Sequence, residues 1–197
     1  MNIKNVVKGA LATTTMMCLV SFGAFAQSSN SNSSSNSKLS SADQQFVTKA
    51  AQGGMAEVEL GQLAAQKAQN PQVKQFGQKM VDDHTKANDQ LKQVASQEGV
   101  TLPTGLDAKD QALKDRLSKL SGDQFDRVYM QHMVQDHKKD IADFQKEANN
   151  GKDQQVKQFA QQTLPTLKEH LQMAQQDEQA VVKNGNNGTA TASNQQQ

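Results

Sequence analysis

The chain has 197 residues, and its 21 lysines and arginines nearly balance its 20 aspartates and glutamates. Aromatic residues make up only 4% of it, which argues against a β-sandwich or barrel, because sheets favour aromatic and β-branched side chains. The near-neutral charge argues against nucleic acid as a partner, since that binding depends on a strongly basic surface.

Residues 1–26 have the pattern of a secretory signal peptide. Lys4 and Lys8 precede a short apolar core, and residues 24–26 (Ala-Phe-Ala) form a small-residue cleavage site. The core is shorter than the roughly 20 apolar residues that a membrane-spanning helix needs, and no later segment is as apolar. Cys18, the single cysteine, would leave with the signal, so the mature chain has no disulfide or thiolate. We expect a protein of the periplasm or cell envelope.

Two polar segments flank the patterned part of the chain. Residues 27–40 are rich in serine and asparagine, and residues 184–197 in asparagine, glutamine and threonine. Neither can bury enough apolar surface to offset the entropy of an ordered chain. The sequence therefore predicts a disordered linker, a folded domain over 41–183 and a disordered tail.

The folded region has the apolar periodicity of helices, with apolar residues three or four positions apart. Four long helices are expected over 41–69, 72–98, 123–149 and 153–183, and a short one over 108–120. Pro165 predicts a kink or a local opening near Gln161. The connection 99–122 is long enough to cross the length of a bundle, whereas the other two connections are short. These features predict an all-α, ferritin-like four-helix bundle with a short extra helix in its crossover.

Three of the four histidines, His84, His137 and His170, lie on or beside apolar stripes of different helices. Each is within about three residues of the middle of its helix, or roughly 5 Å at 1.5 Å per residue, so packing would bring them to one level. Glu57 lies at the same height in the first helix, among alanines and glycines that face inward. A buried carboxylate needs a partner, because an unpaired buried charge is very costly. We predict that these four residues bind a single metal ion.

Ordinary structural interpretations stay open for each of these residues. A histidine on a helix stripe is often packed and hydrogen-bonded, and the glutamate could pair with a lysine. Asp140, one turn after His137, is the better candidate to accept a hydrogen bond from a ligating ring, and Asp83 and Asp136 could do the same or be solvated. His132 lies about 140° around its helix from His137 and is ranked as peripheral.

The residue types also bear on the identity of the metal. Imidazole and carboxylate ligands suit iron or zinc, which we rank first. Met80, Met133 and Met173 lie within a turn of the stripe histidines, and their thioethers would suit copper(I). Methionine is also a common filler of helical cores, so copper is ranked behind.

Several motifs of the chain, in order, resemble one bacterial family. They lie at 46–51, 57–60, 80–88, 125–129, 133–137 and 164–171. Over about residues 43 to 175 the chain is similar to the exported family catalogued as domain of unknown function four-one-four-two, whose members often carry an outer-membrane label. The resemblance implies a ferritin-like bundle in the cell envelope and no defined activity.

The chain departs from the di-iron proteins of the ferritin type, which use Glu-x-x-His on two helices. The positions three residues before the stripe histidines (81, 134 and 167) hold valine, valine and leucine. The residues therefore support one histidine-rich ion and not a di-iron centre.

Two functions fit the sequence. The first is an exported envelope protein that binds a transition metal, to buffer it, to sense it or to act under stress. The alternative is a non-enzymatic interaction or chaperone-like protein of the envelope, whose histidines are structural. No serine, threonine or glycine pattern matches a nucleophilic or phosphate-binding site, so we favour a non-enzymatic role. The sequence identifies no protein partner.

Overall fold

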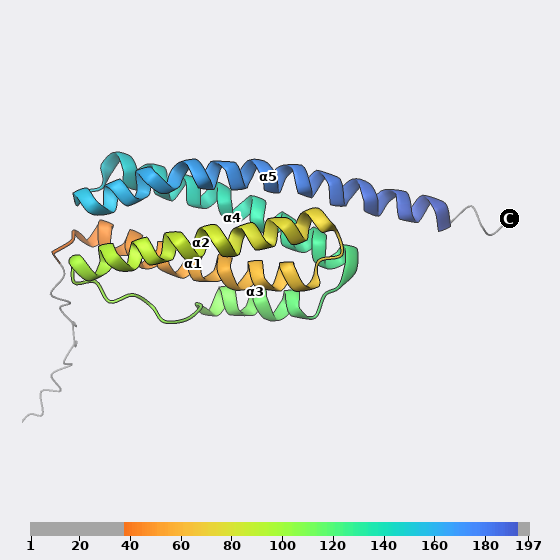
Figure 1. Cartoon of the computed structure of the whole chain (residues 1–197), viewed down its shortest axis with the longest axis horizontal. Helices are drawn as coiled ribbons and strands as arrows, with labels where there is room; N and C mark the ends of the chain where they lie inside the picture. The colour runs from red at the N-terminus through yellow and green to blue at the C-terminus, as the bar shows by residue number, and fades with distance from the viewer. Residues whose placement is uncertain (1–37, 193–197) are drawn as a thin grey trace, which may run out of the picture. The chain divides into compact units, whose positions relative to one another are not determined.

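The structure is a computed structural model that describes residues 38–192, so the predicted signal peptide and most of the predicted linker lie outside it. Every regular element in this range is an α-helix (Figure 1). The helices are α1 (Ser41–Lys67), α2 (Pro71–Gln97), α3 (Ala108–Ser118), α4 (Gly122–Asn150) and α5 (Gln154–Ala192). The prediction of an all-α bundle with a short helix in its crossover is confirmed.

The four long helices form two antiparallel hairpins, α1 with α2 and α4 with α5 (Figure 1). Helix α2 ends where α1 begins, and the following segment leads through α3 back along the bundle to the start of α4 (Figure 1). Helices α2 and α4 therefore run in the same direction, as the predicted ferritin-like connectivity requires. No helix within residues 38–192 combines the length and apolarity needed to cross a membrane.

Short polar side chains set the starts of three helices. Ser40, Asn70 and Asp107 each accept a hydrogen bond from a backbone N–H in the first turn of α1, α2 and α3. Helix α5 runs on to Ala192, beyond the predicted end at residue 183, and it includes Pro165. The composition predicted a tail from residue 184, but extending an existing helix costs far less than nucleating one.

Two buried aspartates join the hairpins at opposite ends of the bundle. Asp126 in α4 accepts hydrogen bonds from two backbone N–H groups of the turn between α1 and α2, at 3.1 and 2.7 Å. Asp43 in α1 accepts from two backbone N–H groups of the turn between α4 and α5, with closest distances of 3.1 and 2.9 Å. Each aspartate thus ties its helix to the turn of the other hairpin, and these hydrogen bonds hold the hairpins in register along the bundle axis.

The apolar core is divided into two clusters by a polar layer. The larger aromatic side chains of one cluster are Phe76, Phe125 and Tyr129, and those of the other are Phe46, Phe144 and Phe159. The segments that separate the buried residues of one cluster from those of the other form this polar layer. They are 52–59 in α1, 81–90 in α2, 135–143 in α4 and 168–173 in α5. All four predicted site residues lie in this layer and are buried, so the polar layer is the natural place to look for chemistry.

Candidate metal centre

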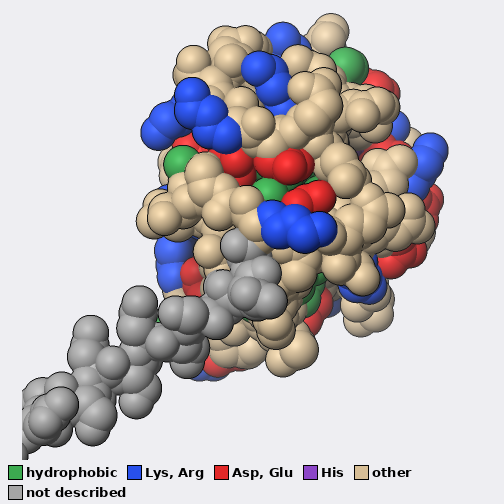
Figure 2. Space-filling view, turned by 90° about the vertical axis from the view of Figure 1, so that its left-hand side faces the viewer, with side chains coloured by type: hydrophobic (Ala, Val, Ile, Leu, Met, Phe, Trp, Pro, Cys, Tyr) green, Lys and Arg blue, Asp and Glu red, His purple; other side chains and the backbone are tan. Residues whose placement is uncertain are grey.

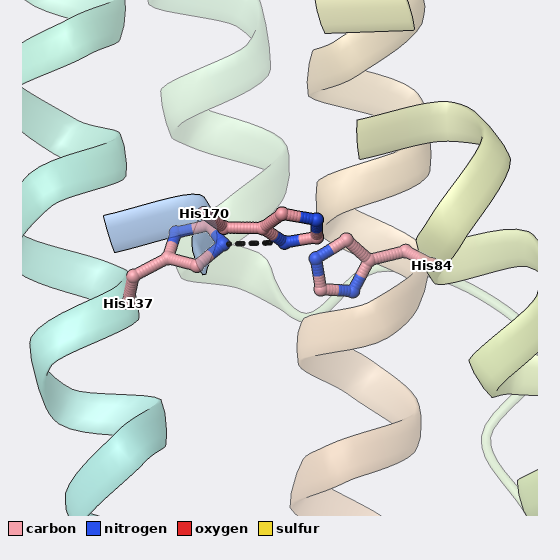
Figure 3. Close-up of side chains that lie close together, drawn as sticks. All are labelled: His84, His137 and His170. Atoms are coloured by element: carbon pink, nitrogen blue, oxygen red, sulfur yellow. Dashed lines mark hydrogen bonds between the residues drawn. The ribbon is translucent and has the colours of Figure 1, made fainter. Parts of the chain in front are cut away.

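His84 from α2, His137 from α4 and His170 from α5 meet at the centre of the bundle (Figure 3). One nitrogen of each ring lies within 4.8 Å of a nitrogen of both other rings, and the ring centroids are 5.3 to 5.8 Å apart. The structure thus brings together the three histidines that the helix heights predicted to be level. Within the described residues, no other set of three histidine, aspartate or glutamate ligands comes this close.

Hydrogen bonds on the outer edges of two rings determine which nitrogen carries the proton. His170 Nε2 donates to Asp83 Oδ2 at 2.8 Å, and His137 Nδ1 donates to the backbone carbonyl of Met133 at 2.9 Å. Carboxylate and carbonyl oxygens can only accept, so both ring protons lie on these outer nitrogens. His137 Nε2 and His170 Nδ1, which are 3.4 Å apart, therefore face each other as two unprotonated nitrogens.

Two facing lone pairs repel each other, and a cation between them would relieve this repulsion. A proton could bridge them only if one ring became positively charged. However, burial and then the neighbouring His170 lower the pKa of His137 to about 4, and burial also lowers the pKa of His170. Two nitrogens bound to one metal at about 2.0–2.1 Å are themselves about 3.3–3.5 Å apart, which matches the observed separation. At neutral pH this pair has the geometry of two ligands of one ion.

His84 completes the group from the opposite hairpin. Its ring is turned toward the other two rings (Figure 3), and its buried Nε2 has no hydrogen-bond partner. Burial, and then the proximity of His137 and His170, lowers the pKa of His84 to about 3, so this ring is neutral as well. A buried polar atom without a partner is costly, and a shared metal ion would satisfy it.

Glu57 lies in the same layer but on the outer side of His137. Its Oε1 is 3.7 Å from His137 Nδ1, and neither carboxylate oxygen has a hydrogen-bond partner. Burial, and then the negative charges of Asp136 and Asp140, raise the pKa of Glu57 well above its ordinary value. Because Nδ1 and Nε2 point in opposite directions, Glu57 is not part of the nitrogen group, and its role as a fourth ligand stays a prediction.

The acid that orients a ligating ring is Asp83, one of two residues for which the sequence left this role open. Burial acts to raise its pKa, but hydrogen bonds from His170 and Lys79 hold the pKa of Asp83 below its ordinary value. The sequence favoured Asp140 for this role, but Asp140 instead pairs with Lys139 at 3.4 Å. An adjacent Asp-His pair occurs at both 83–84 and 136–137, so the sequence has no signal that singles out Asp83.

The chain belongs to the family described as domain of unknown function (DUF4142), whose sequence model matches residues 28–176. This confirms the resemblance found in the sequence. A search of curated proteins finds no match.

Solved structures share the fold. A DUF305 fragment from Deinococcus radiodurans is 15% identical, covers 74% of this chain and 98% of its own, and has a TM-score of 0.62. CopM in its Cu(I)-bound form is 16% identical, and the match covers 70% of this chain and 96% of the CopM chain with a TM-score of 0.58. CopM in its Cu(II)-bound form is 17% identical, with the same coverage and a TM-score of 0.59. Identities this low establish the helical-bundle fold alone.

Proposed function

We propose that this DUF4142 protein binds a single transition-metal ion through His84, His137 and His170, and that it buffers or senses this metal in the cell envelope. The observation that carries the proposal is the pair of ring nitrogens, His137 Nε2 and His170 Nδ1, that face each other 3.4 Å apart in a buried layer. Export through the signal peptide at 1–26 and a periplasmic or envelope location are part of the proposal. The charged start, apolar core and small-residue cleavage pattern support that part.

Copper(I) is the ion that we favour. The nitrogen group offers three neutral imidazoles and no carboxylate. Zinc and iron(II) carry two charges and usually take four or more ligands, whereas singly charged copper(I) is stable with two or three neutral ones. CopM, which has the same fold, is known in Cu(I)-, Cu(II)- and Ag-bound forms, and this supports the choice. We therefore rank copper(I) ahead of iron and zinc, whereas the residue types alone had suggested iron or zinc first.

Glu57 would assist the site through His137. A metal on Nε2 withdraws electrons from the ring and makes Nδ1–H a stronger donor, and the carboxyl group 3.7 Å away would stabilise that change. Direct ligation by Glu57, as predicted from the sequence, would require the His137 ring to turn over and give up its bond to the Met133 carbonyl.

Anaerobic titration with copper(I), delivered from a chromogenic chelator, tests the proposal. Wild-type protein should take up one equivalent, and His84→Ala, His137→Ala and His170→Ala should each abolish tight binding. His132→Ala is the matched control, because His132 lies outside the nitrogen group, and it should bind like wild type. Circular dichroism checks that every variant is folded.

Two results would contradict the proposal. One is a wild-type protein that stays free of copper, silver and zinc when each is supplied in excess. The other is a loss of metal in His132→Ala equal to that in the three ligand variants. If the ligand variants lose only stability, the alternative of an interaction protein with structural histidines is favoured.

A further inference from the structure

We infer that the metal ion reaches the histidines through a cleft between α1 and α4, and that Asp140 receives the ion at the inner end of that cleft. This inference rests on the proposed function, because it concerns how the histidine site is loaded. It concerns residues that are not themselves ligands in the site described above.

Two neighbouring spaces mark the route. The outer one is a cleft of about 120 Å³ lined only by α1 and α4 residues, from 42–50 and 139–147. The inner one is a cavity of about 20 Å³ that has His84 in its wall. Ala50, Asp140 and Phe144 line both spaces, so the cleft and the cavity adjoin at these three residues. The route therefore leads from the surface to a histidine of the site.

The surrounding helices leave this side of the bundle open. Helix α3 covers the other half of the groove between α1 and α4, where Lys114 bonds Glu59 at 2.5 Å and Lys67 bonds the carbonyl of Ser118. The α1 residues that line the cleft come earlier in the helix than either of these contacts. Helix α3 thus covers one half of the groove between α1 and α4, and the half that leads to the histidines stays uncovered.

The inner cavity suits a single ion or water molecule. A water molecule needs about 10–15 Å³ of such space and two to four polar partners. Asp140, Asn88, Thr163 and His84 supply polar groups among otherwise apolar walls. His84 is also the most exposed of the three histidines, at 7% against 0% for the other two. An arriving ion would therefore meet His84 first.

Asp140 has the properties of a receiving group. Its side chain is 18% exposed and lines both spaces. Its partner is Lys139, whose ammonium lies 3.4 Å from Asp140 and 3.2 Å from Asp143 and whose side chain is 59% exposed. A flexible, exposed ammonium is easily displaced, so an incoming cation can take its place beside the carboxylate.

The surface at this end of the bundle is consistent with such a route. Figure 2 looks onto the end where α1 begins and α4 ends, and it shows acidic and basic side chains close together. No histidine appears on this face (Figure 2). On this face a metal ion therefore meets carboxylates and no imidazole.

Loading kinetics on the full-length mature protein test the inference. Copper(I) uptake from a weak chromogenic chelator gives the association rate, and removal by an excess of a strong chelator gives the dissociation rate. Asp140→Asn should slow loading about tenfold, because it removes the carboxyl group that the ion meets where the cleft adjoins the cavity. Ala50→Leu should slow it as well, by narrowing the passage between the two spaces. The controls are Asp89→Asn, at an exposed residue that lines neither space, and Ala42→Leu, which alters a residue lining the cleft but not the cavity.

The inference expects a specific pattern of results. A route affects entry and exit alike, so Ala50→Leu should slow both rates and leave the dissociation constant within about twofold of wild type. Wild-type rates in both Ala50→Leu and Asp140→Asn, with one copper bound, would overturn the route and leave the proposed function intact. Weaker binding with unchanged association would make Asp140 part of the equilibrium site and would also overturn the route. A wild-type protein that binds no metal would overturn the proposed function itself.

Discussion

His137 Nε2 and His170 Nδ1 lie 3.4 Å apart, and neither carries a proton, because each ring already donates its only N–H to an oxygen on its outer edge. These outer bonds decide the chemistry of the site. They aim two lone pairs at a common point, where His84 adds a third nitrogen from the other hairpin. The three nitrogens come together only because the two hairpins pack against each other.

Removing the carboxylate of Asp83 should weaken metal binding without removing a ligand. In Asp83→Ala the Nε2–H of His170 loses its acceptor, so the ring can rotate or change tautomer, and affinity should fall by about 10- to 100-fold. Competition with a chromogenic copper(I) chelator measures the change. Asp82→Ala, at an exposed neighbouring position, is the control, and an equal loss in that variant would refute an orienting role for Asp83.

Metal-free protein should lose stability as the pH falls below about 6.5. Burial, then the proximity of the other two histidines, lowers the pKa of His84 to about 3, and burial followed by His170 lowers that of His137 to about 4. In the unfolded chain both rings take up protons near pH 6.5. The contribution of the two neutral rings to the free energy of unfolding is therefore complete above about pH 6.5. Below that pH it declines by roughly 1.4 kcal/mol per pH unit for each ring, until the pH reaches the pKa of that ring in the folded protein.

Urea unfolding at about pH 5 and about pH 7.5 measures this dependence. His84→Gln removes one of the two rings, so its stability should fall less between these pH values than that of wild type. Parallel pH profiles for the two proteins would show that His84 does not resist protonation in the fold.

Glu147 should have the opposite pH dependence. Burial, and then the negative charge of Asp43, raises the pKa of Glu147 to about 7. The fold therefore favours the neutral carboxyl group, and its contribution is present below the unfolded pKa near 4.5 and lost as the pH rises through about 7. As the pH rises from 4.5 to 8, the free energy of unfolding of Glu147→Gln should increase by about 1–3 kcal/mol relative to that of wild type. Thermal unfolding at both pH values measures the gain, and Glu169→Gln, whose side chain is 59% exposed, should show none.

Close packing of α1 against α2 should make Gly61 intolerant of a methyl group. A Cβ at Gly61 would lie 2.7 Å from the carbonyl oxygen of Gly77, a contact that cannot be relieved by moving a side chain. Gly61→Ala should therefore cost about 1–3 kcal/mol despite the better helix propensity of alanine. At Gly53 the nearest atom would be 3.8 Å away, so Gly53→Ala should be neutral or stabilising. Denaturant unfolding of both variants checks this, and equal effects would contradict it.

Much of the fold can be predicted from local patterns. Helix starts follow from single residues such as Ser40 and Asn70, and the long crossover follows from the spacing of apolar stripes. The end of α5 could not be placed in this way, because composition alone does not register that the preceding residues already form a helix that can be extended. The layer of three histidines could be predicted because rise per residue converts position along a helix into height.

The details of the site lay beyond that reasoning. Whether Asp83 or Asp140 supports a ring depends on which groove each side chain enters, and this is set by helix rotation and crossing angle rather than by spacing. The same rotation puts Glu57 at the Nδ1 edge of His137 instead of among the lone pairs. The backbone carbonyl of Met133, which fixes the tautomer of His137, belongs to no side-chain pattern.

For this protein the sequence alone determined the helices, their order and the height of each histidine, because those properties depend on contacts between residues close together in the chain. Only the tertiary structure decided which ring edges face inward and which acid orients which ring. Those relationships join residues such as Asp83 and His170, 87 positions apart, and exist only once two hairpins have packed at a fixed rotation and register.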